Sequence, residues 1–230
     1  MNEQTIIDVV IPAYRPGAEF RELLKRLSRQ TRPVRRIIVM NTRTETDVQA
    51  LLADCPKAEL HELDKSEFDH GGTRDAGARL SDADYLLFLT QDALPADEYL
   101  VERLAAAFTE PRIRAAYARQ LARPDCRELE RFTRVFNYPE ESRVKTAADL
   151  PELGIKTFFC SNVCALYERE TYVNLGGFIK KTIFNEDMIY AGGLIKAGYA
   201  IAYAADARVI HSHNYSGIEQ FHRNFDLAVS

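Results

Sequence analysis

The sequence predicts an α/β protein built on a doubly wound, mostly parallel sheet. Almost unbroken apolar runs, within IIDVVI at residues 6–11 and RRIIVM at residues 35–40, are typical of strands buried on both faces of such a sheet. Segments with apolar residues at helical spacing separate these runs, as in βαβ units. With 230 residues, 46% of them hydrophobic, the chain is long enough for one such domain with a sizeable core.

The elements of the first half follow in regular order, and Pro12 ends the first strand. Expected strands are residues 6–11, 35–40, 58–63, 85–89 and 115–120, and expected helices are residues 18–27, 47–53, 73–80 and 99–108. In doubly wound sheets, ligands bind at the carboxyl ends of the strands. Residues 12–15, 41–44 and 90–92 each follow a strand, so we expect them to converge on one cleft.

The second half is less regular. Residues 123–156 are charged, contain three prolines and show a helical pattern only at 129–136, so we predict a long excursion over the cleft that carries specificity. A strand-like run at 158–167, a turn at Gly176 and Gly177, a helix from about Asn185 and a strand at 200–210 follow. We expect one domain over residues 1–230, with two halves that meet near residue 120.

The last predicted helix is amphipathic. Its apolar residues lie on one face at helical spacing: Ile218, Phe221, Phe225 and Ala228. Such a face is expected to pack on the core more often than on a membrane surface, so core packing is the preferred interpretation.

Composition and charge narrow the function classes. The formal net charge of −4 argues against a dedicated nucleic-acid-binding protein, because counterion release requires clustered lysines and arginines. No apolar run approaches the roughly 20 residues of a membrane helix, and the N-terminus lacks the basic-then-apolar order of a signal peptide, so we expect a soluble, cytoplasmic chain. The four cysteines lack CxxC spacing, which favours small buried side chains over a zinc site or disulfides.

Two groups of carboxylates are candidates for chemistry. In LLFLTQDALP, Asp92 follows a buried strand and should point into the cleft. In NEDMIYAGGLIKAGY, Asn185 is a plausible N-cap that sets Glu186 and Asp187 in the first helical turn. Helix capping alone would explain these acids. However, two mid-helix glycines follow at 192 and 193, which indicates close approach to another element or to a ligand.

Seven segments in register carry a family resemblance: VVIPAYRPG, IIVMNTRTETD, FDHGGTRDAGA, FLTQDALPADEYL, FFCSNVCALYERETYVNLGGF, NEDMIYAGGLIKAGY and VIHSHNYS. With them the chain resembles the inverting nucleotide-sugar glycosyltransferases of family 2, which have the GT-A fold, and most closely their bacterial rhamnosyltransferase-like branch. The resemblance implies a Rossmann-like nucleotide-binding half merged with a mixed, acceptor-side half. A dinucleotide-binding oxidoreductase, the other fold reading, would need GxGxxG where this chain has IPAYRPG.

The resemblance also implies a divalent cation, Mg²⁺ or Mn²⁺, on the donor diphosphate. Asp92 matches the metal-contacting carboxylate of the family's strand-end motif, whereas Thr90 stands in place of the first acid. Either His211 or His213 matches a late metal-contacting histidine, and we prefer His213 because it lies nearer the turn at 214–216. These histidines could instead be ordinary strand-end side chains bonded to backbone.

Asp187 matches the family's general base, and Glu186 either assists it or caps the helix. An inverting transfer needs a carboxylate on the acceptor side and a cation beside the departing diphosphate. Position at a helix N-terminus should keep Asp187 ionised at pH 7.

The resemblance assigns seven residues to the nucleotide-sugar donor: Pro12, Ala13, Tyr14, Asn41, Arg74, Gln91 and Asp92. Tyr14 could stack on the base. Asn41 stands where many relatives carry an aspartate, and its amide can pair with the imide edge of uracil or thymine, so both dTDP and UDP donors stay open. Gly71 and Gly72 would permit close backbone approach beside Arg74, although a plain glycine turn with a surface arginine explains that stretch as well.

The expected activity is transfer of a sugar, rhamnose by resemblance, from a dTDP- or UDP-sugar to a glycan or lipid-linked acceptor in surface-polysaccharide synthesis. The loss of an acid at Thr90 motivates an alternative, a catalytically silent nucleotide-sugar-binding module. A dehydrogenase would not explain Asp187 or the paired histidines. If the acceptor is lipid-linked, the chain is also expected to contact the inner membrane surface transiently. Relatives often continue past the segment that ends at Ser230, so an acceptor-side element beyond it stays open.

Overall fold

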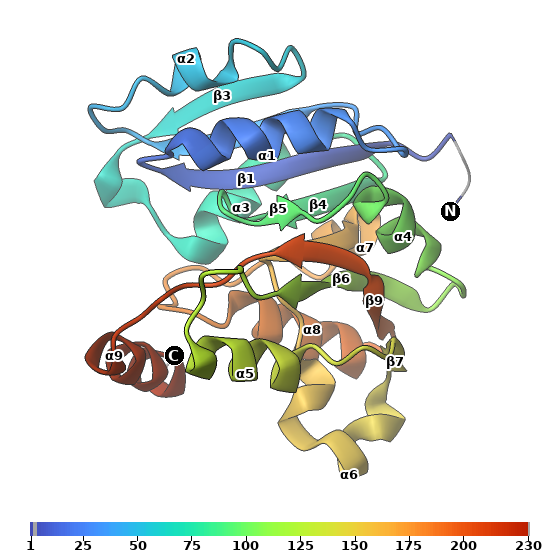
Figure 1. The fold of residues 1–230 in the computed structure, drawn as a ribbon. Helices are drawn as coiled ribbons and strands as arrows, with labels where there is room; N and C mark the ends of the chain where they lie inside the picture. Colours follow the sequence, from blue (N-terminus) through green and yellow to red (C-terminus); the bar gives the residue numbers. More distant parts are fainter. Residues whose placement is uncertain (2–3, 230) are drawn as a thin grey trace.

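A computed structural model of the chain describes Met1 and residues 4–229. The described residues form one nine-stranded mixed sheet in the order β3-β2-β1-β4-β8-β6-β9-β5, with β7 paired to β9 (Figure 1). Strands β1 to β4 run parallel to one another, whereas β8 is antiparallel to both β4 and β6. The expected α/β fold with a Rossmann-like half and a mixed half is confirmed.

The first half closely follows the sequence pattern. Its strands are β1 (Ile7–Tyr14), β2 (Ile37–Thr42), β3 (Ala58–Leu63), β4 (Tyr85–Leu89), β5 (Leu94–Pro95) and β6 (Ile113–Leu121). Its helices are α1 (Ala18–Ser28), α2 (Val48–Leu52), α3 (His70–Arg79) and α4 (Leu100–Ala106), with a 3-10 turn at Lys65–Glu67. Pro12 lies within β1 rather than ending it, and β2 continues to Thr42, so both strands carry their last residues further toward the cleft.

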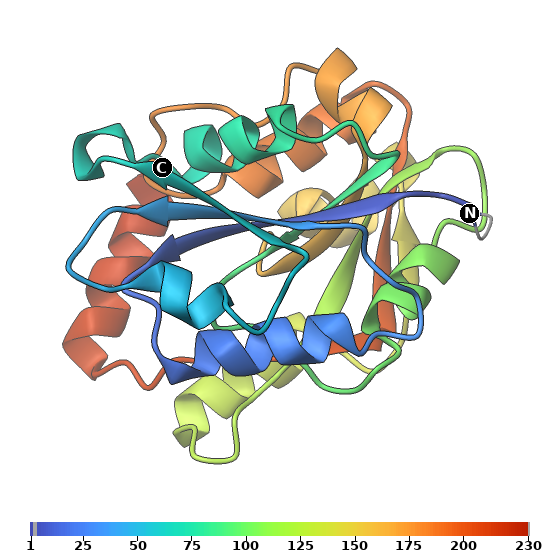
Figure 2. The same ribbon diagram turned by 90° about the horizontal axis from the view of Figure 1, so that it is seen from above.

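The core lies on both sides of the sheet. Alternate residues of β1 belong to different clusters: Val9 and Ile11 pack with α1, α2 and α4, whereas Val10 packs with α3, α7 (Arg169–Asn174) and α8 (Glu186–Lys196). Figure 2 shows α1 and α4 on one side of the sheet and α3 and α8 on the other. Burial on both faces is why the strand sequences are continuous apolar runs.

The second half departs from the prediction at two places. The run at 158–167 is not one strand, because a 3-10 helix at Gly154–Phe158 and a loop precede β8 (Cys164–Glu168). The segment 123–156 is more ordered than expected, since it forms α5 (Glu128–Asn137), β7 (Arg143–Lys145), a 3-10 turn at Ala147–Asp149 and α6 (Leu150–Leu153). Strand β7 forms because it pairs with β9 (Ala200–Ile210). The spacing of apolar residues within 123–156 does not predict this long-range pairing.

Helix α9 (Gly217–Val229) does not pack on the core, so the preferred interpretation of its apolar face is wrong. Ile218, Phe221 and Phe225 are 71%, 67% and 59% exposed. The helix is attached through its other face, where the carbonyl of Leu227 accepts a hydrogen bond from Asn185 Nδ2 at 3.0 Å. Across the described residues, no helix has the length and apolar character needed to cross a bilayer.

Helix α8 begins as expected, with Glu186 and Asp187 in its first turn, but no other element packs closely against its two central glycines. Asn185 occupies the N-cap position, but it adopts a left-handed conformation (φ 66°) and its side chain makes no capping hydrogen bond. A Cβ added at Gly193 would meet nothing within 4 Å, and at Gly192 it would only touch Phe158 at 4.0 Å. The two glycines therefore do not mark close packing.

Candidate active site

A cleft of 570 Å³ lies at the carboxyl ends of the strands, where the sequence places the ligand site. Its walls come from α3, the residues after β4, the end of β6, α5, residues 159–163, the start of α8, the residues after β9, and α9. Asp92 and Asp187, about 95 residues apart in the chain, both line this cleft. The fold thus brings the two predicted carboxylate groups together.

Asp92, His211 and His213 form one cluster. Their ligand atoms all lie within 4.8 Å of one another, and each histidine Nε2 is 3.6 Å from an Asp92 carboxylate oxygen. Burial alone would raise the pKa of Asp92, but the two histidines hold that pKa well below its usual range. Burial and neighbouring His211 lower the pKa of His213, which favours the neutral, metal-coordinating imidazole at pH 7.

Gln120 orients His211 within this cluster. His211 Nδ1 and Arg134 both contact Gln120 Oε1, at 3.0 and 2.7 Å. Arg134 can only donate, so the shared Gln120 atom is the amide oxygen and His211 Nδ1 carries the proton. The lone pair of His211 Nε2 then faces Asp92. A support of this kind is typical of metal-binding histidines.

The cluster fits a divalent cation. Ligand atoms about 2.1 Å from an octahedral ion lie roughly 3 Å apart when adjacent and about 4.2 Å apart when opposite, so the observed separations need only small adjustments. A carboxylate oxygen with two imidazole nitrogens leaves open positions that diphosphate oxygens can fill. Asp92 and both histidines, rather than one of them, are therefore positioned to hold such an ion.

Asp187 lies at the start of α8, on another wall of the cleft. Its carboxylate accepts hydrogen bonds from the backbone N–H groups of Asn162, at 2.9 Å, and Met188, at 2.8 Å. Burial and the neighbouring Glu186 carboxylate raise the pKa of Asp187 to about 6, outweighing these hydrogen bonds. A pKa of about 6 leaves Asp187 mostly ionised at pH 7, which suits a general base.

Glu186 is held in an ion pair rather than facing the cleft alone. Its carboxylate lies 3.1 Å from Arg74 NH1, and both side chains are almost fully buried. Asn162 Nδ2 also donates to Glu186, at 3.3 Å. The arrangement makes Glu186 a positioning residue that ties α8 to α3. Arg74 lines the cleft but is already paired with this acid.

Two predicted donor residues, Gln91 and Tyr14, contact each other. Gln91 Oε1 accepts from the backbone N–H of Tyr14 at 2.8 Å, and Gln91 Nε2 donates to the Tyr14 carbonyl at 3.0 Å. The side chain thereby continues the pairing of β1 with β4 beyond Leu89. Both of its polar groups are used, so Gln91 positions the end of β1. Tyr14 itself is exposed, with the Arg15 guanidinium 5.2 Å from its ring.

Asn41 is buried, and neither polar atom of its amide has a hydrogen-bond partner among the described residues. Ala13 lies beside it in the register of β1 and β2, next to Pro12. A buried, unpaired amide at a strand end points to a ligand. Within the described residues, the lining of the 570 Å³ cleft includes none of Pro12, Ala13, Tyr14, Asn41 and Gln91, so a base-binding role there stays a prediction.

The glycines before Arg74 serve the packing of α3. A Cβ on Gly71 would lie 2.0 Å from the Ile179 carbonyl oxygen, so the two backbones are in close contact. Asp69 caps α3 by accepting from the Gly72 N–H, and it also accepts from the Lys181 N–H at 2.7 Å. His70, at the start of the helix, lines the cleft.

Sequence reasoning did not identify Arg223, on α9, as a site residue. Arg223 lines the cleft, and its guanidinium lies 5.1 Å from the ring of Phe184 and 5.6 Å from the ring of Tyr215. Arg74 and Arg134, also in the cleft, pair with Glu186 and Glu130, whereas no carboxylate pairs with Arg223 in the part of the chain that the structure describes. The hydrophobic pattern of α9 did not indicate that Arg223 would line the cleft, because Arg223 lies on the polar face of that helix.

A Rossmann-like half, a metal-fitting cluster at its strand ends and a buried carboxylate across the cleft are the features expected of a nucleotide-sugar glycosyltransferase. The chain belongs to glycosyl transferase family 2, whose sequence profile matches residues 8–176. The matched region contains Asp92 but ends before Asp187 and the two histidines.

Two curated relatives extend the match over nearly the whole chain. The chain is 41% identical over 224 residues to the O-antigen chain rhamnosyltransferase RfbN of Salmonella typhimurium, covering 97% of this chain and 71% of that protein. It is 38% identical over 223 residues to the O-antigen chain rhamnosyltransferase WbaN of Salmonella anatum, covering 96% and 70%.

Solved structures share the fold at low sequence identity. TarS of S. aureus (residues 1–349) aligns with a TM-score of 0.70 at 15% identity, covering 89% of this chain and 59% of that one. Mannosyltransferase PcManGT from Pyrobaculum calidifontis, solved with GDP-Man and Mn²⁺, aligns with a TM-score of 0.69 at 15% identity, covering 97% and 66%. The chain thus spans about three fifths to two thirds of these solved chains, and they support the GT-A fold.

Proposed function

We propose that the chain is an inverting glycosyltransferase that transfers a sugar, rhamnose by analogy with the two relatives, from a dTDP- or UDP-sugar to a glycan or lipid-linked acceptor. The observation that carries this proposal is the joint presence in one cleft of the Asp92–His211–His213 cluster and ionised Asp187. Residues 1–120 would hold most of the donor site, and residues 121–230 would provide the acceptor side and the base within a single domain.

Each carboxylate then has a separate task. Asp187 takes the proton of the acceptor hydroxyl as the hydroxyl oxygen bonds to C1 of the sugar and the bond from C1 to the diphosphate breaks. Asp92, His211 and His213 would hold Mg²⁺ or Mn²⁺, which when bound neutralises charge on the leaving diphosphate. Glu186 and the Asn162 N–H keep the base in position. Attack from the face opposite the leaving group inverts C1.

The donor class is tested by binding. We expect dTDP or UDP to raise the melting temperature more in the presence of Mn²⁺ than in its absence, because the diphosphate completes the ion's coordination. GDP is the matched control nucleotide. Calorimetry with each nucleotide gives the affinities, and flat responses to all three nucleotides would contradict the proposed donor site.

The pH dependence of transfer should reveal the base. Because Asp187 must be deprotonated to accept the proton and its pKa is raised to about 6, kcat/KM should fall as the pH drops through 6 and should level off above about 7. The Glu186→Gln variant removes a charge that raises this pKa, so its profile should move to lower pH. A profile that is flat between pH 5 and 7 would contradict the assignment of Asp187.

Arg223 is proposed to meet negative charge on the diphosphate, since no acid in the described chain pairs with it. Arg223→Gln should lower kcat/KM by about 10²-fold, and Arg223→Lys should recover part of that loss. The control is Arg131→Gln, an exposed arginine on α5 outside the cleft lining. Equal activity of Arg223→Gln and the control would remove Arg223 from the site.

Two further expectations stay open to test. A catalytically silent binding module would bind the nucleotide without transferring any sugar, so turnover by the wild-type chain discriminates it from the enzyme. Peripheral contact with the inner membrane surface stays a prediction, motivated now by the exposed apolar face of α9. Liposome flotation of the wild-type chain tests it, and no bound protein would remove it.

A further inference from the structure

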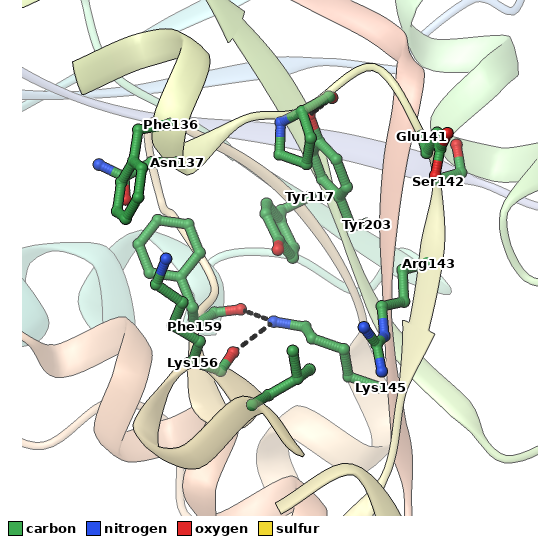
Figure 3. Close-up of a pocket in the computed structure, with 12 residues that line it drawn as sticks. Tyr117, Phe136, Asn137, Glu141, Ser142, Arg143, Lys145, Lys156, Phe159 and Tyr203 are labelled. Atoms are coloured by element: carbon green, nitrogen blue, oxygen red, sulfur yellow. Dashed lines mark hydrogen bonds between the residues drawn. The ribbon is translucent and has the colours of Figure 1, made fainter. Parts of the chain in front are cut away.

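A second cavity, of 400 Å³, adjoins the catalytic cleft, and its size lies within the range of ligand-binding pockets. Four aromatic residues contribute to its walls: Tyr117, Phe136, Phe159 and Tyr203. We call it the aromatic pocket (Figure 3). Phe159 and Asn137 line both the aromatic pocket and the cleft, so the two spaces share a wall.

The hydroxyl of Tyr117 faces the pocket without a hydrogen-bond partner in the described part of the chain. Tyr117 is 4% exposed and lines the pocket, yet no described residue forms a hydrogen bond with its hydroxyl. The neighbouring tyrosines differ: Tyr203 donates to the Pro139 carbonyl at 2.6 Å, and Tyr138 accepts from Gln120. Burial raises the pKa of Tyr117, which keeps the hydroxyl protonated. The unpaired hydroxyl faces the cavity and can bond to a ligand with hydrogen-bonding groups of its own.

The cations of the pocket do not require an anionic ligand, and an exposed acid, Glu141, also lines it, so the charges together favour a neutral ligand. The Lys145 ammonium donates to the carbonyls of Lys156 and Phe159, as Figure 3 shows, and lies 4.9 Å from the Tyr117 ring. Arg143 pairs with the carboxylates of Asp149 and Glu152, each at 2.9 Å. Two of the three cations are therefore already satisfied. The third, exposed Lys156, lies over the Phe136 ring at 3.9 Å.

The pocket lies on the side of the base. Phe159, in its wall, is three residues from Asn162, whose backbone N–H donates to Asp187 at 2.9 Å. Every lining residue of the pocket comes from residues 117–203, and among them only Tyr117, on β6, belongs to the first half of the chain. A molecule that extends from the aromatic pocket past Phe159 into the cleft would thus reach the carboxylate that accepts the hydroxyl proton.

We propose that the aromatic pocket is an acceptor subsite, which binds a neutral sugar ring adjacent to the ring whose hydroxyl Asp187 deprotonates. This inference rests on the proposed glycosyltransferase function. Aromatic faces can cover the apolar C–H face of a sugar ring, while the Tyr117 hydroxyl and the Asn137 amide bond to ring hydroxyls. The pocket then selects the acceptor by the sugar that precedes the reacting one.

Binding of simple sugars tests the subsite without knowledge of the full acceptor. The probes are neutral methyl glycosides of hexoses and 6-deoxyhexoses, titrated into the whole chain and followed by saturation-transfer NMR. We expect at least one to bind saturably. Tyr117→Phe, which keeps the ring and removes only the hydroxyl, should weaken its binding by about 2- to 10-fold. Phe136→Ala, at an exposed position, should weaken it by a similar factor.

Phe132→Ala is the matched control. Phe132 lies on the same helix, is 66% exposed against 59% for Phe136, and stacks on that ring at 6.0 Å, but it does not line the pocket. It should leave glycoside binding unchanged. Equal weakening by both alanine variants, displacement of the glycoside by inorganic phosphate, or no saturable binding by any glycoside would each overturn the subsite.

Nucleotide binding and sugar transfer separate failure of the subsite from failure of the proposed function. Binding of dTDP or UDP with Mn²⁺ should be the same in Tyr117→Phe, Phe136→Ala and the wild-type chain. If the wild-type chain transfers sugar while the pocket variants leave glycoside binding unaltered, the subsite is wrong and the glycosyltransferase stands. If glycosides bind as expected and no donor is ever turned over, the pocket stands as a sugar site and the proposed transfer is wrong.

Discussion

Asp187→Asn is expected to lower kcat by about 10²- to 10⁴-fold while nucleotide binding persists, because the amide cannot take the proton of the acceptor hydroxyl. The amide oxygen can still accept from the Asn162 and Met188 N–H groups. Single-turnover transfer with a saturating acceptor, measured beside calorimetric nucleotide binding, gives the two quantities. Full turnover by Asp187→Asn would show that another group is the base.

Unfolding should not explain that loss. Since burial raises the pKa of Asp187, the charged form is the less favoured one in the folded state, so folding stability due to this group rises as the pH falls from 6 toward 4. A neutral asparagine should therefore preserve or slightly raise the melting temperature at pH 7. Glu128→Gln, an exposed acid in the first turn of α5, is the control for removing a first-turn charge.

Asp92→Asn is expected to abolish the Mn²⁺-dependent part of nucleotide binding and to lower kcat/KM by roughly 10²- to 10³-fold, because a neutral amide oxygen is a poorer ligand for a divalent cation. His211→Gln and His213→Gln should each give the same pattern to a smaller extent. The measurement is thermal shift with dTDP or UDP, with and without Mn²⁺, followed by transfer kinetics.

Asp206→Asn is the matched control for Asp92→Asn. Asp206 is an exposed aspartate on β9, the strand that leads to the two histidines, and it lies outside the cleft lining. Its substitution should change neither the manganese response nor the kinetics. An Asp92→Asn chain with an unaltered manganese response would mean that the ion is held elsewhere.

The strand cores were readable from the sequence because burial on both faces leaves an unbroken apolar run, as at Ile37–Thr42 and Tyr85–Leu89. The position of Asp92 in the cleft at the carboxyl ends of the strands was also predicted, because it follows from the parallel topology. Association of Asp187 with the same cleft did not follow from periodicity. It rested on family resemblance, because nothing local fixes where α8 lies relative to β4.

The sequence did not predict which partners the polar side chains of the site contact. Gln91 looked like a donor-site residue, but both of its amide groups pair with the Tyr14 backbone. Asp187 is ionised as expected at pH 7, yet its pKa is raised rather than lowered, because burial beside Glu186 outweighs the helix N-terminus. Such balances depend on distances between residues far apart in the chain.

By itself, the sequence determined the α/β class, the order of the main elements in the first half and the two carboxylate groups, because hydrophobic period and strand-end position are local properties. Only the tertiary structure decided that both histidines join Asp92, that α9 turns Arg223 toward the cleft and its apolar face outward, and that the Tyr117 hydroxyl is left unpaired in a ring-lined pocket. These depend on which strands and helices become neighbours, and long-range packing rather than local sequence sets that choice.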